Sequence, residues 1–488
     1  MSIVNKLIIK YKTMGLPAKA SVWYTLCNVL QKGIAFLVVP IYTRVLTKGE
    51  YGLYSTFQSW KDIIIIFATL NLYCGVFTKA MVDLNPKERD GYTSCMQGLT
   101  TLVSALLFIL YFPLRSSINS FLEMDTFTIC LMFGYFIFYP SILFWSVRQR
   151  VEYRYIKMVV ITLVISVLVP SVSLLLLYTT GLREKSVIWG YLFVNIFFGL
   201  LFYVYNFWRG KTFFSKNYWV KALKFNIPLI PHYLALIVLG QSDRIMIQKM
   251  VGEDEVALYS LAYQISMLMT ILISGIDSAL VPWEYESFKN KQFKKVSSVC
   301  TKIAFAVGIL IVVAVLISPE LVYILGGNKY SESIWIIPAV SISIFFMYIY
   351  GLFSSIEFYY GNTKFVMIAS SLAALLNIGL NYFFIKMYGY MAAAYTTLIC
   401  YVFLAIIHYV FAIIVKNKNG VKEKIYDFKI LSILSLIFLS TLPFCLLLYK
   451  YPIGRYIFIT VFLVVILICR RSFLNLFRKI KGKENEKN

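Results

Sequence analysis

The fold of this chain is decided by residues Leu223–Trp283, which read LKFNIPLIPHYLALIVLGQSDRIMIQKMVGEDEVALYSLAYQISMLMTILISGIDSALVPW. Two apolar stretches lie on either side of a short acidic turn, Glu253–Glu255. Each stretch is long enough to cross a hydrocarbon core of about 30 Å, for which a helix needs roughly 20 residues. The segment therefore predicts a membrane-spanning helical hairpin.

Three charged residues interrupt the apolar stretches of this hairpin, namely Asp243, Arg244 and Asp277. A charge at the centre of a membrane helix costs about 2.5 to 3.5 kcal/mol, so such residues tend to mark a polar pathway. Pro228 and Pro231 stand near the start of the first stretch and predict a kink there. The hairpin thus combines a membrane-embedded element with a candidate functional path.

The hairpin has a weaker copy near the N-terminus. Residues Leu46–Ser55 read LTKGEYGLYS and residues Val251–Ser260 read VGEDEVALYS. Both segments link the first two apolar stretches of a six-stretch run. Duplicated halves are a common architecture of transporters, in which the substrate binds where the repeats meet. The repeat predicts two related six-helix lobes.

The composition agrees with a membrane protein. Of the 488 residues, 60% are hydrophobic and 14% are charged, and the mean hydropathy is +0.75, whereas soluble domains carry about 25% charged residues. The net charge of +24 would suit a nucleic-acid-binding protein, but the basic residues gather in alternate loops. Topology and attraction to anionic membrane lipids account for this charge, so no nucleic-acid partner is expected.

Apolar runs of about 20 residues predict an all-α, multi-pass membrane protein with about fourteen transmembrane helices. The predicted spans are 17–43, 51–78, 92–112, 121–147, 158–180, 186–208, 225–249, 256–283, 303–325, 333–356, 365–388, 391–415, 430–449 and 456–469. The first span is too long for a signal peptide and lacks a small-residue cleavage site, so we expect it to remain in the mature chain.

One set of loops is far more basic than the other. It carries 34 Lys and Arg residues against 11 in the opposite set, and Lys32 and Lys61 lie inside spans. The positive-inside rule assigns the basic set, and with it both termini, to the cytoplasm. The basic set comprises 1–19, 79–91, 148–157, 209–224, 289–302, 357–364, 416–429 and 470–488.

No catalytic or cofactor-binding motif stands out. The eight cysteines are scattered without a CxxC pair, and no HExxH, Walker or Gly-x-Ser-x-Gly pattern occurs. The connecting loops are short, which leaves no room for a catalytic domain outside the membrane. We therefore expect no enzyme activity, no cofactor and no metal site.

Further charges lie inside the predicted spans of the N-terminal half. Lys32 is near the middle of the first span, too deep to reach the membrane surface comfortably, so it should face a wet cavity or pair with an acid. Lys61 and Asp62 are neighbours in the second span, and Gln58 stands one turn before Asp62. These residues could line a path or form a self-contained charged patch, and the sequence leaves both interpretations open.

The C-terminal half leaves similar alternatives. Asp243 and Arg244 could form an internal salt bridge, anchor the helix at the membrane interface or take part in ion coupling. Asp277 and Glu284 are seven residues apart and share nearly one helical face. Asp277 is the deeper of the two, and a deep carboxylate that faces a cavity can hold a proton or a sodium ion.

Other polar residues of this half are interpreted as structural. Asn377 and Asn381 share a helix face and can join helices by hydrogen bonds. Glu357 is expected at the cytoplasmic end of its span, as a boundary residue. His408 is expected to be a buried hydrogen-bonding group.

Several of these segments together resemble the polysaccharide flippases of bacterial cell surfaces. The resemblance lies in Thr43–Tyr54, in Asn226–Pro228 with Asp243-Arg244, in Leu258–Ser260 and in the segment from Asn377 to Gly389. Their order and spacing along nearly the whole chain are similar to those of Wzx-type O-antigen and repeat-unit translocases. These belong to the multidrug/oligosaccharidyl-lipid/polysaccharide (MOP) superfamily.

This resemblance implies an architecture of two six-helix lobes around a central cavity, followed by two additional helices. The expected division is 1–208 for the N-terminal lobe, 209–415 for the C-terminal lobe, 416–429 for a cytoplasmic linker and 430–488 for two helices with a basic cytoplasmic tail.

The resemblance also implies a function. Members of the family flip undecaprenyl-diphosphate-linked oligosaccharides across the bacterial inner membrane by alternating access, driven by a proton or sodium gradient. A cationic lumen for the diphosphate would be formed by Lys32, Lys61, Arg44 and Arg244. The coupling ion would be carried by Asp62, Asp243 or Asp277. Membrane lipids and other polysaccharide-assembly proteins are the further partners that the resemblance implies.

Two alternatives remain open at this point. A related exporter of drugs or other small molecules would have an apolar pocket without a cationic lumen, and Lys32 and Lys61 argue against it. A membrane polymerase or ligase of glycans would need a sizeable periplasmic loop with catalytic residues. No such loop is visible in the sequence.

Overall fold

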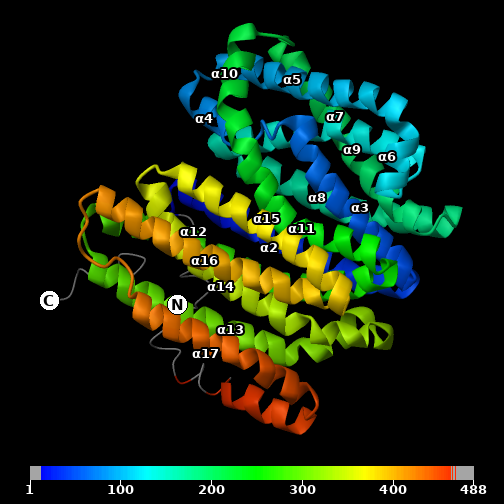
Figure 1. The fold of residues 1–488 in the computed structure, drawn as a ribbon. Helices are drawn as coiled ribbons and strands as arrows, with labels where there is room; N and C mark the ends of the chain where they lie inside the picture. The colour runs from blue at the N-terminus through cyan, green and yellow to red at the C-terminus, as the bar shows by residue number, and fades with distance from the viewer. Residues whose placement is uncertain (1–12, 463, 465–467, 469–488) are drawn as a thin grey trace. The chain divides into compact units, whose positions relative to one another are not determined.

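The structure is a computed structural model that describes residues 13–462, 464 and 468. The described part is helical throughout and contains no β-strand (Figure 1). It divides into two compact units, one ending at Ile237 and the other beginning at Val238, so the boundary falls inside a helix. The all-α fold class predicted from the sequence is confirmed. The division at 208, 415 and 429 stays a prediction.

The first unit is built from helices of very different length. Its helices are α2 (Leu16–Val45), α3 (Lys48–Thr69), α4 (Val76–Asp83), α5 (Glu88–Tyr111), η1 (Phe112–Leu114), α6 (Arg115–Leu122), α7 (Thr126–Val151), α8 (Tyr155–Thr180), α9 (Glu184–Gly210), α10 (Lys216–Asn226) and η2 (Ile227–Leu229), followed by the start of α11 (Ile230–Met250). Its core lies where α7 packs against α5 and α9.

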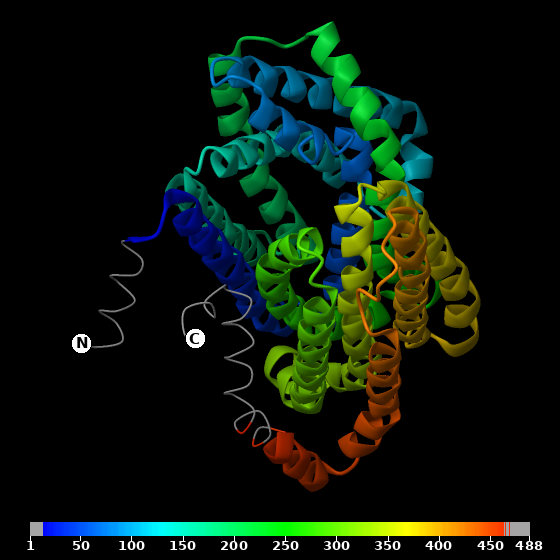
Figure 2. The same ribbon diagram turned by 90° about the vertical axis from the view of Figure 1, so that its left-hand side faces the viewer.

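The second unit contains the rest of α11 and the longest helices of the chain. Its elements are α12 (Glu253–Lys289), α13 (Phe293–Gly326), η3 (Asn328–Trp335), α14 (Ile337–Tyr359), α15 (Thr363–Tyr388), α16 (Ala392–Lys418) and α17 (Phe428–Tyr449). Figure 2 shows a short apolar helix, Pro452–Phe462, that follows α17 across a tight turn. Helix α14 packs against its neighbours on every side and lies next to α16 along its length.

Twelve helices of the described residues are long and apolar enough to cross a membrane. They correspond to twelve of the predicted spans. Helix α3 corresponds to the predicted span 51–78 but falls short in hydropathy, because Lys61 and Asp62 lie within it. Pro452–Phe462 covers the start of the predicted span 456–469. The rest of that span and most of the basic tail lie outside the described residues.

The second predicted span is wrong at its C-terminal end. Helix α3 stops at Thr69, since Leu70 and Asn71 take left-handed conformations with φ of 48° and 50°, and α4 begins only at Val76. The side-chain amide of Asn226 donates to the carbonyl oxygens of both Leu70 and Asn71, at 2.9 Å each. These bonds satisfy backbone groups that the break releases.

The predicted hairpin is confirmed. Helices α11 and α12 are joined by a turn at Val251 and Gly252. Glu253, Asp254 and Glu255 occupy the first turn of α12, where their negative charges complement the positive end of the helix dipole. The expected irregularity near Pro228 appears as the short 3-10 segment η2 between α10 and α11.

Candidate functional site

Lys61 is the most deeply placed cation of the first unit. It lies on α3, and its residue is 6% exposed. Its ammonium group donates to Gln58 Oε1 at 2.6 Å and to the Tyr191 hydroxyl at 3.0 Å, and it lies 3.2 Å from Asp62 Oδ1. The three donors of a lysine are therefore matched by three oxygen atoms. Asp62 is the accessible member of this group, with 37% of its side chain exposed.

Tyrosine rings surround this ammonium group. Its nitrogen lies 4.5 Å from the ring centroid of Tyr191 and 5.8 Å from that of Tyr135, within the range of cation–π attraction. Tyr135 stacks on Tyr139 at 4.5 Å, and its hydroxyl meets that of Tyr191 at 3.3 Å. Helices α7 and α9 supply these rings. The result is a buried ammonium group whose contacts all favour a positive charge, beside one accessible carboxylate. We call Lys61, Asp62, Gln58, Tyr135, Tyr139 and Tyr191 the lysine cluster.

Asp243 on α11 forms the corresponding charged centre of the second unit. It is fully buried. Its carboxylate accepts hydrogen bonds from the Asn381 amide at 2.6 Å, from the Thr397 hydroxyl at 2.7 Å and from the Tyr259 hydroxyl. These donors come from α15, α16 and α12, so a single carboxylate joins four helices.

A ladder of amides and hydroxyls extends from this carboxylate. Asn377 Oδ1 accepts from Ser242 at 2.9 Å and from the Asn381 amide at 3.2 Å. The Asn377 amide donates to Thr397 at 3.3 Å, and Thr396 donates to Asn381 Oδ1. The expectation that Asn377 and Asn381 join helices by hydrogen bonds is met. Asn381 also donates directly to Asp243, whereas Asn377 reaches that carboxylate only through Asn381 and Thr397. We call these residues with Asp243 the aspartate cluster.

Arg244 does not pair with Asp243 among the described ion pairs. Its guanidinium group donates to Ser260 at 3.1 Å, to the Gly240 carbonyl at 3.1 Å and to Gln241 at 2.8 Å. It also lies over the Tyr263 ring, 4.5 Å from the centroid. The internal salt bridge considered from the sequence is therefore absent, because the two adjacent side chains leave the helix in different directions.

The other predicted site residues lie apart from these clusters. Lys32 on α2 is exposed, and no described residue forms an ion pair with it. Arg44 is exposed near the end of α2 and donates to the Pro40 carbonyl at 3.1 Å. Asp277 on α12 is half-buried, and its charge acts on Glu284 and Tyr350. The seven residues thus do not form one constellation within either unit.

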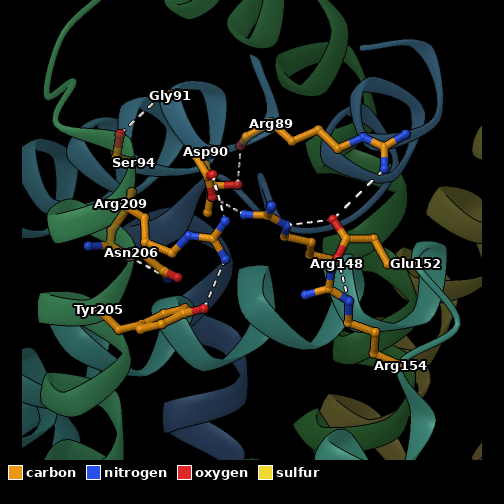
Figure 3. A network of polar contacts seen from close by, with 12 residues as sticks. Arg89, Asp90, Gly91, Ser94, Arg148, Glu152, Arg154, Tyr205, Asn206 and Arg209 are labelled. Carbon is orange, nitrogen blue, oxygen red and sulfur yellow. Dashed lines mark hydrogen bonds and ion pairs between the residues drawn. The ribbon is translucent and has the colours of Figure 1, made fainter. Parts of the chain in front are cut away.

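An ion-pair network of the first unit was not predicted (Figure 3). Arg148 near the end of α7 pairs with Asp90 and with Glu152, the latter at 2.8 Å, and Arg209 near the end of α9 reaches Asp90 at 2.9 Å. Arg89 lies 3.8 Å and Arg154 3.2 Å from Glu152. The sequence signal for this network is the group of arginines at 148, 150 and 154, within the segment 148–157 that the sequence predicts as a basic loop. The network joins one end of α5, α7 and α9.

Two family models match the chain. The model described as polysaccharide biosynthesis protein matches residues 18–288, and the model described as MatE matches residues 228–383. The chain is also 27% identical over 390 residues to "Lsg locus putative protein 1" of Haemophilus influenzae, covering 74% of this chain and 89% of the relative. A second H. influenzae protein, described as an uncharacterized membrane protein, is 25% identical over 381 residues, covering 74% and 88%.

Solved structures share the fold. The lipid II flippase MurJ in an inward closed conformation has a TM-score of 0.71 at 14% identity, covering 93% of this chain and all of that chain. An inward-facing multidrug resistance MATE family transporter of the MOP superfamily has a TM-score of 0.61 at 15% identity, covering 80% and 96%. At these identities the comparison establishes the fold alone.

Proposed function

We propose that this chain, which belongs to the polysaccharide biosynthesis protein family, flips undecaprenyl-diphosphate-linked oligosaccharide repeat units across the bacterial inner membrane. The family and the fold make it a membrane transporter of the MOP superfamily and not an enzyme. The product would feed the synthesis of O-antigen or another surface polysaccharide. In this proposal both termini face the cytoplasm, and other polysaccharide-assembly proteins are partners.

The observation that carries this proposal is the lysine cluster. A diphosphate offers several strong acceptor oxygens to a charge-assisted donor. Lys61 keeps its charge in a buried, tyrosine-lined position, and its only anionic partner among the described residues, Asp62, is 37% exposed. An arriving diphosphate can take the place of Asp62 on the ammonium group. The tyrosine rings offer flat surfaces on which a sugar can lie.

The remaining cations have supporting roles in the proposal. Lys32 is the exposed cation of α2 that would attract the diphosphate before it reaches Lys61. Arg44 lies at the end of α2, where it would contact the diphosphate at one end of the proposed transport path. Arg244 is held by Ser260 and Gln241, so it would meet substrate only after a change in those bonds.

Transport would be driven by a proton or sodium gradient through alternating access. Among the three carboxylates, Asp62 would lose its contact with the Lys61 ammonium group when substrate binds there, and it is accessible enough to accept a cation. Asp277 is half-buried on a membrane helix and suits ion exchange with water. Asp243 is occupied by three hydrogen-bond donors, which makes it the slowest of the three to exchange an ion.

A cation-coupled exporter of drugs or other small molecules is the second candidate. The match of the MatE model to residues 228–383 and the likeness to MATE transporters favour it. Such a substrate is apolar or cationic and gains nothing from a buried ammonium group. The two candidates therefore differ in what they require of Lys61. A polymerase or ligase of glycans has no such support.

The test is complementation of a strain that lacks its repeat-unit flippase, using wild type, Lys61→Met and Lys61→Arg. We expect wild type to restore surface polysaccharide and Lys61→Met to reduce it at least about tenfold at equal membrane abundance. Lys61→Arg should keep part of it, because a positive charge remains although the planar, delocalised guanidinium group differs in shape from the ammonium group. Lys424→Met serves as the control, since it removes an exposed lysine between α16 and α17.

Two results would count against the flippase. Wild type that fails with several lipid-linked glycans but lowers drug accumulation in the same cells would support the exporter. Full activity of Lys61→Met would show that the lysine cluster does not meet the diphosphate.

A further inference from the structure

Glu357 and His408 form a buried acid–imidazole pair in the second unit. His408 Nδ1 lies 2.7 Å from Glu357 Oε1, and the side chains are 2% and 0% exposed. Glu357 lies near the end of α14, and His408 lies on α16, beside it. The ring of Tyr350 stacks on the imidazole with centroids 5.4 Å apart. Glu357 was expected at a membrane boundary, whereas the structure buries it.

The second oxygen of this carboxyl group has no partner. Glu357 Oε2 is buried and accepts no hydrogen bond from any described residue. An ionised carboxylate with a bare oxygen is costly in such surroundings. A proton on Oε2 removes that cost, and a neutral imidazole can still donate its Nδ1 hydrogen to Oε1. The geometry therefore favours a pair that holds one proton on the carboxyl group.

The neighbouring helices carry lysines, namely Lys416 on α16, Lys364 on α15, Lys302 on α13 and Lys429 on α17. Among the described residues none of them forms an ion pair with Glu357, whose charged partner is His408. Helix α12 contributes Glu284 and Asp277, and α13 contributes Cys300. Tyr426, before α17, donates to Glu284 at 2.8 Å, and Cys300 lies 3.1 Å from the same oxygen. Tyr350 and Tyr348 lie on α14 itself, and α16 contributes Tyr401 and Tyr409 besides His408. Glu284 therefore has neutral hydrogen-bond donors. Glu357, in contrast, has one carboxyl oxygen, Oε2, that accepts no hydrogen bond from a described residue.

We propose that Glu357, positioned by His408, binds the proton that drives transport. This proposal rests on the proposed gradient-driven flippase and assigns its coupling ion to a carboxyl group other than Asp62, Asp243 and Asp277. In the packed state the proton stays on Glu357 Oε2. When α14 and α16 move so that water reaches this oxygen, the proton leaves to water and the carboxylate remains; rebinding a proton allows the helices to close again.

A sodium ion fits this pair poorly. Hard cations take several oxygen ligands, whereas Glu357 is faced by an imidazole nitrogen. Among the described residues no group of three or more His, Cys, Asp and Glu side chains could hold a metal ion. A proton needs only one oxygen atom, and Oε2 supplies it.

The direct test is infrared difference spectroscopy of the purified protein in phosphatidylethanolamine/phosphatidylglycerol vesicles during a pH titration. We expect a carboxylic-acid C=O band that Glu357→Gln removes. His408→Gln should shift the midpoint of that band by about one pH unit, a tenfold change in proton affinity. Glu284→Gln tests the other buried carboxyl group, and Glu423→Gln, an exposed acid before α17, is the control.

Complementation supplies the second readout. Glu357→Gln should abolish surface polysaccharide at normal membrane abundance, and Glu423→Gln should not change it. A titrating band that persists in Glu357→Gln and disappears in Glu284→Gln would overturn the proposal. So would loss of the band in Glu357→Gln with unchanged complementation, because the proton would then not drive transport.

Failure of the proposed substrate gives a different pattern. The infrared titration needs no lipid-linked sugar. A wild type that complements no flippase strain but shows the Glu357 band would count against the substrate and support the proton site. Size-exclusion chromatography would show whether Glu357→Gln is denatured. In that case the His408→Gln variant supplies the test, and an unchanged midpoint of the carboxylic-acid band in this variant would overturn the proposal.

Discussion

Asp243 and Lys61 show two ways of keeping a charge inside a membrane helix bundle. Lys61 combines an accessible carboxylate with tyrosine rings. Asp243 is held by neutral donors from three other helices. The Asp62 carboxylate of the first arrangement is accessible, whereas Asp243 in the second is fully buried. Our proposal therefore gives substrate binding to the lysine cluster and helix positioning to the aspartate cluster.

The aspartate cluster leads to a prediction about stability. Asp243→Ala leaves the amide of Asn381 and the hydroxyls of Thr397 and Tyr259 without their acceptor, and each buried unsatisfied group costs about 1 to 3 kcal/mol. We expect a clear drop in the melting temperature of the detergent-solubilised protein, measured by intrinsic fluorescence. Asp254→Ala, in the first turn of α12, is the control. Equal melting temperatures for wild type and Asp243→Ala would contradict the structural role.

The sequence predicted which polar residues lie within membrane helices, but it did not predict which residues of other helices they bond to. Hydropathy placed Asp243, Lys61 and Asp277 inside membrane helices, and helical periodicity placed Asn377 and Asn381 on one face. Thr397 lies 154 residues from Asp243 and was not considered, since a serine or threonine in an apolar helix carries little signal alone. Which faces of two helices meet depends on their rotation within the bundle, and a single sequence does not give that rotation.

Close packing of helices α8 and α9 depends on a glycine. A methyl group built at Gly190 would lie 2.5 Å from the Cα atom of Ser173, a backbone atom that cannot move alone. In membranes such small residues allow helices to approach closely. Gly190 could not be recognised from the sequence, because a glycine in a predicted span does not reveal which backbone it faces.

Gly190→Ala should therefore destabilise the first unit by about 1 to 3 kcal/mol, the usual cost of overpacking. The readout is the temperature at which half of the protein is lost from the monodisperse peak in size-exclusion chromatography. Gly379→Ala on α15 is the matched control, because nothing lies within 4 Å of its added methyl group. Equal melting temperatures for Gly190→Ala and Gly379→Ala would show that close packing at Gly190 does not stabilise the first unit.

An ion pair joins the first turn of α3 to the residue that precedes α9. Arg183 donates to Glu50 at 2.8 and 2.9 Å and to the Val45 carbonyl at 3.1 Å. Glu50 also closes a capping box with Thr47 at the start of α3. Partial burial opposes ionisation of Glu50, but the bonds from Arg183 and the Thr47 amide outweigh it and lower the pKa of that carboxyl group.

A pH dependence of the first turn of α3 follows. Because the folded pKa lies below the ordinary Glu value of about 4.3, the contribution of Glu50 is present above that value and is lost as the pH falls through the folded pKa. Hydrogen exchange at Lys48–Tyr51 should be slower in wild type than in Glu50→Gln at neutral pH, and the ratio should approach one at acid pH. A ratio independent of pH would contradict the role of the ionised pair.

At the scale of the whole chain, each unit contains one Leu-Tyr-Ser segment, and the tyrosines of the two segments make different contacts. Tyr54 and Tyr259 both lie seven residues into the second helix of a pair, within the Leu-Tyr-Ser segments. Tyr259 donates to Asp243, while Tyr54 packs against Tyr42 on α2 with centroids 5.7 Å apart. The repeat predicted from the sequence therefore has a counterpart in helix position, and the charged centres have diverged.

The topology of the chain can be tested at α17, which separates the basic segment before it from the turn after it. With 22 residues at about 1.5 Å each, α17 is about 33 Å long, enough to cross the hydrocarbon core. Single cysteines at the exposed Lys418 and Lys450, in a variant whose native cysteines are replaced, should react with a membrane-impermeant maleimide from opposite sides. The basic segment 416–429 predicts that Lys418→Cys reacts only after the inner membrane is opened and that Lys450→Cys reacts in intact spheroplasts. Labelling of both positions from one side would mean that α17 does not span the membrane, and the reverse pattern would invert the proposed orientation of every loop.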